Sequence, residues 1–250
     1  MVIAELNYYE ELFSVRNKIV LVTGASRGIG FELATNFCKA EAHVIGIGRT
    51  EKIKSNNFDY ISADITKRND LINVGETISS KHDKLNIIVN SAGISSSPLI
   101  NDNNYDFDKI LKTNLTAVYE CCVTMLDYIK DGGSIINITS IASYFGFPEN
   151  PGYISSKGGL SALTRSLAFD LSRRKIRVNN IVPGYIQTSM TSDSFNDIDL
   201  RKQRESRMLI NRWGQVGDLV GAAIFLASDA SSYITGADIV VDGGWSIKGL

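Results

Sequence analysis

Short apolar runs alternate with longer amphipathic stretches along almost the whole chain. The apolar runs are typical of strands buried on both faces of a sheet, and they cover residues 18–23, 43–47, 58–62, 85–90, 134–139, 175–182 and 237–241. Stretches with helical spacing of apolar residues lie between them, at 31–42, 71–82, 105–129, 151–173 and 217–228. This alternation predicts an α/β fold, with a doubly wound, seven-stranded parallel sheet and helices on both faces.

The pattern runs without a linker, an internal repeat or a low-complexity tract, so residues 1–250 are expected to form a single domain. Two segments depart from it. Residues 1–16 precede the first strand and are interpreted as a surface arm. Residues 187–212 are polar, charged and weakly periodic, and this segment is long enough to form a mobile lid over a substrate site.

Composition narrows the class of protein. The chain has a net charge of −1 and no clustered basic excess, so nucleic acid is not an expected partner. No apolar run approaches the ~18 residues of a membrane span, and the first residues lack the pattern of a signal peptide. We therefore expect a cytoplasmic protein without membrane contact. Cys38, Cys121 and Cys122 lack metal-like spacing, which predicts reduced packing residues and no metal site.

A glycine-rich turn joins the first strand to the first helix after it. The turn reads TGASRGIG over Thr23 to Gly30. Strand, turn and helix in this order predict a dinucleotide site, because glycines let the backbone approach a pyrophosphate at the start of the helix. The spacing G-x-x-x-G-x-G differs from the general fingerprint, so the turn alone is also compatible with a simple tight turn.

Ser140, Tyr153 and Lys157 form a second candidate site. A helix start at Asn150 to Gly152 places Tyr153 and Lys157 one turn apart on one face. A nearby ammonium is expected to lower the pKa of the phenol from its ordinary value of about 10. A serine hydroxyl aimed at the same point can hold a carbonyl oxygen. Beside a hydride carrier, these groups suit reduction of a ketone or oxidation of an alcohol.

The chemistry-bearing motifs all follow predicted strands. Residues 24–30 follow the first strand, 90–93 the fourth, Ser140 the fifth and 183–188 the sixth. Ligands in doubly wound sheets bind beyond the carboxyl ends of the strands. All four motifs are therefore expected on one rim of the sheet.

Order and spacing of these motifs resemble the classical short-chain dehydrogenase/reductase family, whose fold is Rossmann-type. The resemblance extends from about Lys18 to Gly244 and rests on TGASRGIG at 23–30, NSAG at 90–93, Asn114, Ser140, YISSK at 153–157, Pro183-Gly184 with Thr188, and VDGG at 241–244. Ser91 departs from the pattern, because the family usually repeats asparagine there. That asparagine is generally structural, so we expect no effect on the chemistry.

The resemblance implies a catalytic set of Asn114, Ser140, Tyr153 and Lys157. Tyr153 acts as the acid/base in this family, and Ser140 holds the carbonyl oxygen. Lys157 lowers the pKa of the tyrosine and holds the nicotinamide ribose, while the asparagine binds a water in a proton relay with the lysine.

Two of these assignments have alternatives in the sequence. Thr139 and Ser143 could stand in for Ser140. Asp64 resembles the residue that accepts from adenine N6, but it could equally cap a helix beginning near Thr66. The cofactor contacts implied as a whole are Gly24, Ser26, Arg27, Gly28, Ile29, Gly30, Arg49, Asp64, Ile65, Asn90, Ala92, Gly93, Tyr153, Lys157, Pro183, Gly184, Ile186 and Thr188, the last at the nicotinamide carboxamide.

The end of the second strand indicates NADP(H). An NAD enzyme places a carboxylate there on the ribose 2′-hydroxyl, but here Gly48 stands at the usual position, followed by Arg49, and no acid occurs before Glu51. Arg27 supplies a second cation from the glycine-rich turn. Two guanidiniums can bind a 2′-phosphate. The alternatives are that both arginines are exposed surface charges, or that the enzyme is an NAD-dependent polyol or sugar-acid dehydrogenase.

The substrate is less closely determined. The expected pocket positions mix hydroxyl, amide and aromatic groups: Ile94, Ser95, Ser143, Tyr144, Phe147, Asn150, Tyr185 and Met190. The C-terminal third resembles the branch that holds 3-oxoacyl-[acyl-carrier-protein] reductases and gluconate 5-dehydrogenases. A thioester-linked carbonyl, a keto-sugar and a keto-acid all fit.

Partners follow from the same resemblance. Basic residues at 173–175 and 201–207 are candidates for docking an acidic acyl carrier protein, or are solvated faces. A homotetramer is expected. The helices over 105–129 and 151–173 carry apolar stripes; the sheet needs one such face, and in this family the remaining faces and the strand around 239–241 pack between subunits. The alternative is that both stripes are purely core. A non-catalytic dinucleotide sensor is a remote alternative, because such proteins typically lose the tyrosine or lysine.

Overall fold

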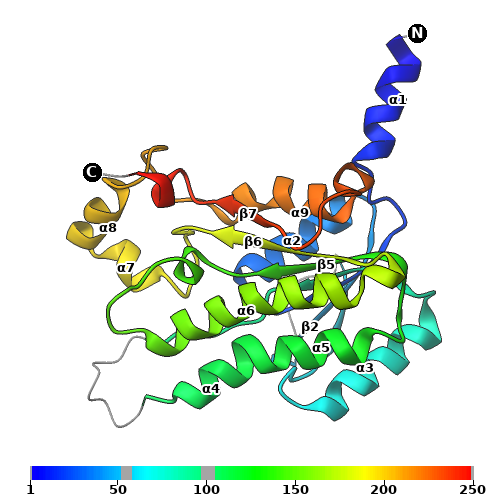
Figure 1. Ribbon diagram of the computed structural model, residues 1–250, viewed down its shortest axis with the longest axis horizontal. Helices are drawn as coiled ribbons and strands as arrows, with labels where there is room; N and C mark the ends of the chain where they lie inside the picture. Colours follow the sequence, from blue (N-terminus) through cyan, green and yellow to red (C-terminus); the bar gives the residue numbers. More distant parts are fainter. Residues whose placement is uncertain (1, 52–57, 97–104, 249–250) are drawn as a thin grey trace.

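The computed structural model describes residues 2–51, 58–96 and 105–248, with side chains described from residue 7 onward (Figure 1). Seven parallel strands form one sheet in the order β3-β2-β1-β4-β5-β6-β7. The strands are β1 Ile19–Thr23, β2 His43–Gly48, β3 Asp59–Ser62, β4 Leu85–Asn90, β5 Ile129–Ile138, β6 Arg177–Pro183 and β7 Asp238–Val241. The order reverses between β1 and β4, which confirms the doubly wound, Rossmann-type prediction.

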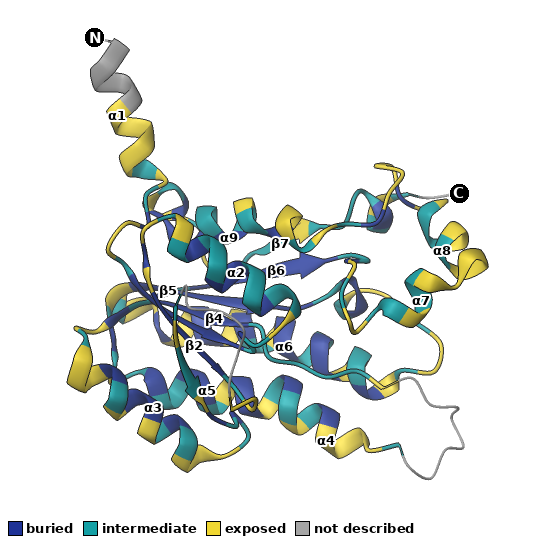
Figure 2. Cartoon of the chain, turned by 180° about the vertical axis from the view of Figure 1, so that it is seen from behind, coloured by how far each residue is buried: buried dark blue, intermediate teal, exposed yellow. Residues whose placement is uncertain are grey.

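Helices cover both faces of the sheet (Figures 1 and 2). One face packs against α2 (Gly28–Lys39) and α9 (Val220–Ala227). The other packs against α3 (Arg68–Lys81), α5 (Ala117–Met125) and α6 (Pro151–Asp170), and α4 (Phe107–Leu111) packs against α6. Each face carries its own apolar cluster, because the central strands are buried on both sides.

Two segments lie apart from these layers. Helix α1 (Val2–Leu12) projects from the body of the molecule, and its Tyr8 and Tyr9 are exposed (Figure 2). Helices α7 (Ser192–Asn196) and α8 (Ile198–Glu205) lie together beyond the end of β6. No described helix is long and apolar enough to cross a bilayer.

The prediction was wrong where the helix over 105–129 gives way to the strand from 134. The helix ends earlier than predicted, and the strand begins earlier. Helix α4 continues through a π-helical segment, Lys112–Thr116, into α5, which ends at Met125. β5 already begins at Ile129, and its pairing with β4 shifts register between Ile129 and Ser134, the stretch that contains the glycine pair at 132–133. Gly132 has φ +79°. The two glycines therefore form an irregularity inside a strand, although they lie between the predicted helix and the predicted strand.

Smaller differences concern helix ends. α2 begins at Gly28 and α3 at Arg68, each three residues earlier than predicted, and α6 ends at Asp170 instead of residue 173. The α2 difference affects function, because the last glycines of the turn are themselves the first residues of the helix. The free N–H groups of that helix end thus belong to the glycine-rich turn.

The apolar stripes expected between subunits lie mostly inside the chain. Val118, Cys122, Leu160 and Leu167 are buried in the cluster that covers one face of the sheet. These apolar side chains pack against the sheet of their own chain, so they offer no free surface to another subunit. The expectation that Cys122 and its neighbour Cys121 are packing residues is confirmed by their complete burial.

A buried polar chain ties α6 to the carboxyl half of the sheet. Asn137 of β5 donates to the Thr164 hydroxyl of α6 at 2.8 Å, and Thr164 donates to Asn180 of β6 at 2.6 Å. Asn180 in turn donates to Asp238 of β7 at 2.6 Å. Asn90 of β4 completes the chain by donating to Asn137 at 2.9 Å. Because unpaired buried amides are costly, this chain fixes where the helix sits on the sheet.

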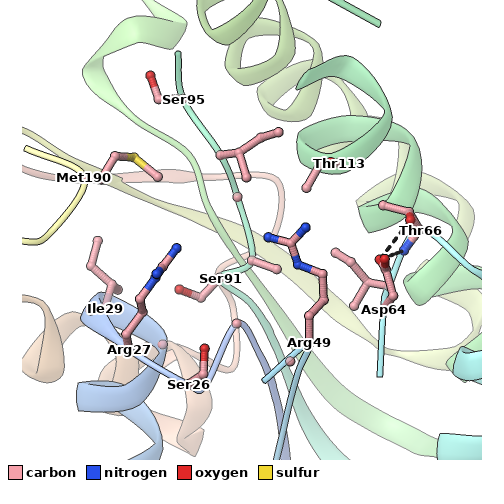
Figure 3. Close-up of a pocket in the computed structure, with 18 of the residues that line it drawn as sticks. Ser26, Arg27, Ile29, Arg49, Asp64, Thr66, Ser91, Ser95, Thr113 and Met190 are labelled. Atoms are coloured by element: carbon pink, nitrogen blue, oxygen red, sulfur yellow. Dashed lines mark hydrogen bonds between the residues drawn. The ribbon is translucent and has the colours of Figure 1, made fainter. Parts of the chain in front are cut away.

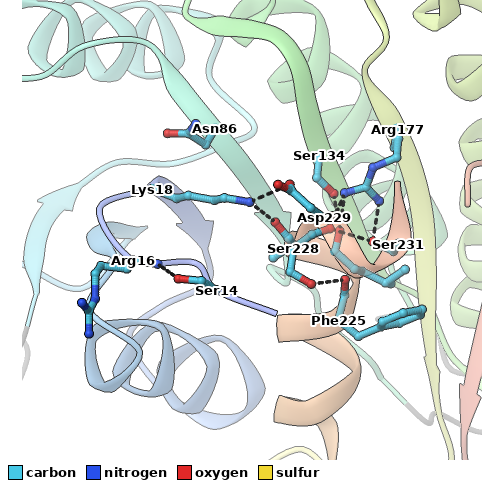
Figure 4. Close-up of polar contacts among 12 residues, drawn as sticks. Ser14, Arg16, Lys18, Asn86, Ser134, Arg177, Phe225, Ser228, Asp229 and Ser231 are labelled. Carbon is cyan, nitrogen blue, oxygen red and sulfur yellow. Dashed lines mark hydrogen bonds and ion pairs between the residues drawn. The ribbon is translucent and has the colours of Figure 1, made fainter. Parts of the chain in front are cut away.

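The C-terminal end of α9 is held by cations. Arg177 donates to the carbonyl oxygens of Leu226 and Ser228 at 2.9 and 3.2 Å, and to the Ser231 hydroxyl at 2.8 Å (Figure 4). Lys18 reaches the Ala227 carbonyl at 3.3 Å. Burial lowers the pKa of Arg177, although the nearby Asp229 opposes that change. Positive charge at this end satisfies carbonyls that have no partner within the helix and complements the helix dipole.

Replacing Arg177 with Met is expected to lower the free energy of unfolding by about 2–3 kcal/mol, because buried carbonyls lose charge-assisted hydrogen bonds. Urea unfolding followed by circular dichroism measures the change. Arg16→Met is the control, since Arg16 is exposed and pairs with Glu41 at the surface, and it should cost less than about 1 kcal/mol. Equal costs for the two variants would contradict this account of α9.

Candidate active site

The four sequence motifs gather at the carboxyl edge of the sheet, as expected from parallel strands. β1 and β4 are neighbours and end at Thr23 and Asn90, which are paired in register. The Thr23 hydroxyl accepts from the backbone N–H groups of Ser91 and Ala92, both at 3.1 Å. These bonds lock the glycine-rich turn against the segment after β4, at the point where the strand order reverses.

A cavity of about 640 Å³ opens along this edge (Figure 3). Most of the predicted cofactor contacts line it, namely Gly24, Ser26, Arg27, Gly28, Ile29, Gly30, Arg49, Asp64, Ile65, Ala92, Gly93 and Thr188. Asn90, Tyr153, Lys157, Pro183, Gly184 and Ile186 are not among its lining residues. The amide of Asn90 belongs to the buried polar chain, and Ile186 is buried in the core.

The glycines of the turn fit a dinucleotide because side chains have no room there. Gly24 has φ +70°, and a Cβ on it would lie 2.8 Å from the backbone of Ala92. A Cβ on Gly30 would clash with the carbonyl of Gly24. The backbone of the turn therefore stays bare and the N-terminus of α2 opens onto the cavity. Such a cradle of N–H groups fits a pyrophosphate.

Arg27 and Arg49 both extend into the cavity, from the glycine-rich turn and from the end of β2 (Figure 3). Neither forms an ion pair within the part of the chain that the structure describes. Both side chains are exposed to solvent, as the alternative interpretation expects, but they line a concave site. Two guanidiniums at this place fit a phosphate on the adenosine ribose.

Asp64 lies on the opposite wall from Arg27. Its carboxylate accepts from the backbone N–H of Thr66 at 3.0 Å and from the Thr66 hydroxyl at 2.8 Å. Burial opposes ionisation, but these hydrogen bonds and the charges of Arg49 and Lys67 hold the pKa of Asp64 below its ordinary value. The side chain thus closes a local turn ahead of α3, close to the capping role that the sequence left open, while still lining the cavity.

Tyr153 and Lys157 lie one turn apart on α6, with the Lys157 Nζ 5.6 Å from the centre of the tyrosine ring. Lys157 is only 5% exposed, and its ammonium donates to the carbonyl oxygen of Ile138 at 2.7 Å. Burial lowers the pKa of Lys157 to about 8. Lys157 is therefore not a solvated surface lysine. Its partly dehydrated ammonium lies close to the Tyr153 phenol.

The expected lowering of the phenol pKa is not seen in the chain alone. Burial raises the pKa of Tyr153, and the Ser140 hydroxyl opposes the rise. The charge of Lys157 favours the ionised phenol, but the loss of water around the ring acts in the opposite direction.

Ser140 is the hydroxyl best placed beside Tyr153. It precedes a short 3-10 turn, Ile141–Ser143, and its Oγ accepts from the N–H of Ala142 at 3.1 Å. The two alternative hydroxyls are both committed to backbone carbonyls. Thr139 is buried and donates to Ile181, and Ser143 donates to the Ser140 carbonyl at 2.6 Å.

Asn114 sits in the π-helical segment and is fully buried. Its Oδ1 accepts from the backbone N–H of Ile94 at 2.8 Å, and its Nδ2 donates to the Ile94 carbonyl at 2.8 Å and to the Ser156 hydroxyl at 3.1 Å. The amide therefore fastens the segment after β4 to α6. Because these hydrogen bonds occupy the amide, a relay water would have to hydrogen-bond to the backbone of this segment. The π-helix alters the backbone hydrogen-bond pattern there.

The cavity is also lined by residues that were not predicted from the sequence, among them Lys109, Lys112 and Thr113. They lie at the start of the long helix. The lysines are three residues apart and so share one face, a signal that helical spacing alone could have provided.

The expected substrate pocket is only partly assembled. Ile94, Ser95 and Met190 line the cavity, and Asn150 donates to the Ser95 hydroxyl at 2.8 Å. Tyr144 points elsewhere, because its hydroxyl donates to Asp238 of β7 at 2.7 Å.

Phe147 and Tyr185 belong to an aromatic cluster, which we define as Phe147, Tyr185, Phe195, Trp213 and Trp245. Helix α8 covers this cluster with arginines. Arg204 lies 4.7 Å from the ring centre of Tyr185, and Arg201 lies 5.2 Å from that of Phe195. These arginines therefore stack on aromatic rings, in contrast to the solvated face that was one reading of residues 201–207.

Arg174, the other candidate for docking an acidic partner, is occupied inside the chain. It donates to Asp131 at 2.8 Å and to the carbonyl oxygens of Leu126 and Ile129 at 2.8 and 2.7 Å. Its flanking residues Arg173 and Lys175 are exposed.

Comparison with known proteins agrees with this architecture. A family model described as enoyl-(acyl carrier protein) reductase matches residues 24–246. Gluconate 5-dehydrogenase of Gluconobacter oxydans is 33% identical, with 96% of this chain and 99% of that protein covered. A 3-oxoacyl-[acyl-carrier-protein] reductase of Chlamydia pneumoniae is 35% identical, with 91% and 96% covered.

A solved structure of a gluconate 5-dehydrogenase from Burkholderia cenocepacia, in complex with NADP and tartrate, superposes with a TM-score of 0.90. It is 28% identical and the match covers 96% of this chain and 99% of that one. The sequence match over nearly the whole chain and the shared fold establish the wider class of oxidoreductase. The chain belongs to the short-chain dehydrogenase/reductase family.

Proposed function

We propose that this protein is an NADP(H)-dependent oxidoreductase that interconverts a carbonyl and a secondary alcohol on a sugar acid or related keto-acid. The observation that carries the proposal is the buried Lys157 under Tyr153, next to a cavity that two arginines enter. That arrangement supports proton transfer at one end of a dinucleotide and phosphate recognition at the other. A sensor has no need of a buried, costly ammonium beside a phenol.

In the proposed mechanism, the glycine-rich turn with Arg27 and Arg49 would hold NADPH, which when bound would supply the hydride for a carbonyl carbon. Tyr153 donates its proton to the carbonyl oxygen, so that the product is the alcohol and the phenol becomes a phenolate. The Ser140 hydroxyl holds the same oxygen as negative charge develops there. Lys157 stabilises the phenolate, and Asn114 keeps the neighbouring loop in place. Oxidation of the alcohol follows the same steps in reverse.

The preference for NADP(H) is supported by the electrostatics of the adenosine end. Arg27 and Arg49 extend into the cavity where a 2′-phosphate would lie, and Gly48 brings no carboxylate to repel it. Related structures of gluconate 5-dehydrogenases have been solved with NADP.

A carboxylate on the substrate is supported by Arg204. Its guanidinium lies against Tyr185, just after β6, and forms no ion pair with any described residue. Burial raises the pKa of Tyr185, while Arg204 and Arg207 oppose the rise, so the local field is positive. We propose that residues 187–212 form a lid that brings this charge to the substrate.

The alternative substrate is a 3-oxoacyl thioester on a carrier protein. It is favoured by the relatives that carry that name, and the exposed Arg173 and Lys175 could contribute to docking. The internal bonds of Arg174 weaken this reading, since the guanidinium is not free to bind an acidic partner.

We also propose a homotetramer. β7 ends the strand order of the sheet, so its outer edge has no partner strand within the described chain. Val240 on β7 is 42% exposed and Phe169 on α6 is 82% exposed. An open edge next to large apolar side chains is a common place for a second subunit.

Tyr153→Phe is expected to lower kcat at least about 100-fold, because the proton donor is removed. The Kd for NADPH, measured by fluorescence titration, should change less than about threefold, since ground-state contacts remain. A variant that keeps a tenth of the activity would rule out Tyr153 as the acid.

Substrate class is tested by following NADPH oxidation with keto-gluconates, neutral keto-sugars and an acetoacetyl thioester. We expect the keto-acids to give the highest kcat/KM, and Arg204→Gln to raise their KM about tenfold or more through loss of a charged hydrogen bond. Lys202→Gln, an exposed position on the same helix, is the control. Turnover of the thioester alone would refute the sugar-acid assignment.

Cofactor choice is tested by Arg49→Ala. Loss of a charge-assisted hydrogen bond to the 2′-phosphate should weaken NADPH binding about tenfold or more, with little change for NADH. Arg16→Ala should alter neither. A parent protein that binds NADH more tightly than NADPH would overturn the proposal.

Light scattering should give a mass about four times the 27.4 kDa of one chain. Val240→Asp at the open edge should reduce that mass, whereas Tyr9→Asp on the projecting α1 should not. A monomer mass for the parent would exclude the tetramer.

A further inference from the structure

The second and third strands carry a complementary pattern of glycines and aromatic residues. Gly46 and Gly48 lie on one face of β2, and Phe58, just before β3, and Tyr60 of β3 lie on the same side. A Cβ on Gly46 would meet the Phe58 ring at 2.6 Å, and a Cβ on Gly48 would meet the Tyr60 hydroxyl at 2.7 Å. The two glycines therefore make room for two aromatic side chains from the edge strand.

Tyr60 thus lies next to position 48, where the choice between NAD(H) and NADP(H) is made. Gly48 lines the nucleotide cavity together with Ser26 and Arg49. After the Tyr60 hydroxyl, the next atom near a Cβ on Gly48 would be Ser26 Oγ, at 3.6 Å. A carboxylate at position 48, as NAD enzymes use, would need the volume that Tyr60 fills.

The Tyr60 hydroxyl is also an unused donor. It is buried and has no hydrogen-bond partner of good geometry among the described residues. Burial raises its pKa, while the nearby Ser26 and Thr50 oppose the rise. A buried hydroxyl without a partner is costly, and here it lies beneath the edge of the cavity formed by Ser26, Gly48 and Arg49.

We propose that Tyr60 is a selectivity residue for the 2′-phosphate of NADP(H). Its ring end excludes an acidic side chain at position 48. When NADP(H) is bound, its O–H, which has no partner here, donates to the Ser26 hydroxyl, so that the serine points its own proton at the phosphate. The proposal rests on the NADP(H) preference. It adds that the phosphate is bound by a neutral hydrogen-bond donor, the Ser26 hydroxyl, as well as by the cation at position 49.

The steric role also changes the simplest way to convert the cofactor preference. Gly48→Asp by itself would push its side chain against Tyr60, and it should lower the melting temperature without creating NAD⁺ affinity. In Gly48→Asp/Tyr60→Phe the blocking oxygen is gone. No atom of the Tyr60 ring is among the three nearest to the position of that Cβ, so the Cβ of the aspartate has room, and its carboxylate is then expected to accept from a free 2′-hydroxyl.

Isothermal titration of NADP⁺ and NAD⁺, with melting temperatures measured in parallel, tests both roles. Tyr60→Phe should raise the Kd for NADP⁺ about three- to tenfold, as for one lost hydrogen bond, and leave the Kd for NAD⁺ unchanged. Tyr128→Phe, a tyrosine packed against Gly75 far from this strand pair, is the control and should alter neither Kd. The double variant should bind NAD⁺ more tightly than Gly48→Asp does. Its melting temperature should return to that of the parent protein.

The outcomes separate this inference from the cofactor proposal. A parent that binds NADP⁺ more tightly, with a Tyr60→Phe variant that changes both Kd values equally or neither, would overturn the role of Tyr60 alone. A stable Gly48→Asp variant that gains NAD⁺ affinity with Tyr60 in place would overturn the steric role. A parent that prefers NAD⁺ would overturn both proposals.

Discussion

The position of α6 on the sheet is the constraint on which the active site depends. The helix is pinned by Thr164, which accepts from Asn137 of β5 and donates to Asn180 of β6. Tyr153 and Lys157 lie on the same helix, two to three turns nearer its N-terminus. Because the polar chain is buried, a shift of the helix would leave several amides without partners. The sheet thereby fixes the position of the Tyr153 phenol relative to the carboxyl ends of the strands.

Burial of Lys157 is the second consequence of that placement. Its ammonium has left bulk water and bonds to the Ile138 carbonyl at the end of β5. Taking a charge out of water is unfavourable, and the lowered pKa of about 8 reflects this cost. A charge held there in advance needs little reorganisation when negative charge forms on a neighbouring phenol, which is the physical basis of electrostatic catalysis.

Two pairs of arginines are held differently in the molecule. Arg27 and Arg49 extend into an open cavity. Arg201 and Arg204, on α8, lie over aromatic rings of α7 and the loop after β6. Stacking covers the flat faces of a guanidinium but leaves its edge donors available. The packing of α8 on the aromatic cluster therefore still allows this segment to meet an anionic ligand.

The sequence by itself determined the order of elements and the rim on which the motifs lie, because apolar strands and glycine turns are local signals. Its errors were also local, as at Gly132, where a glycine pair inside β5 lies between the predicted helix and the predicted strand. Only tertiary structure decided the direction of the Tyr153 pKa, since burial depends on packing. The same holds for the internal bonds of Arg174 and for Tyr60 behind Gly48, because these contacts join residues whose separation in the chain gives no sign that they meet.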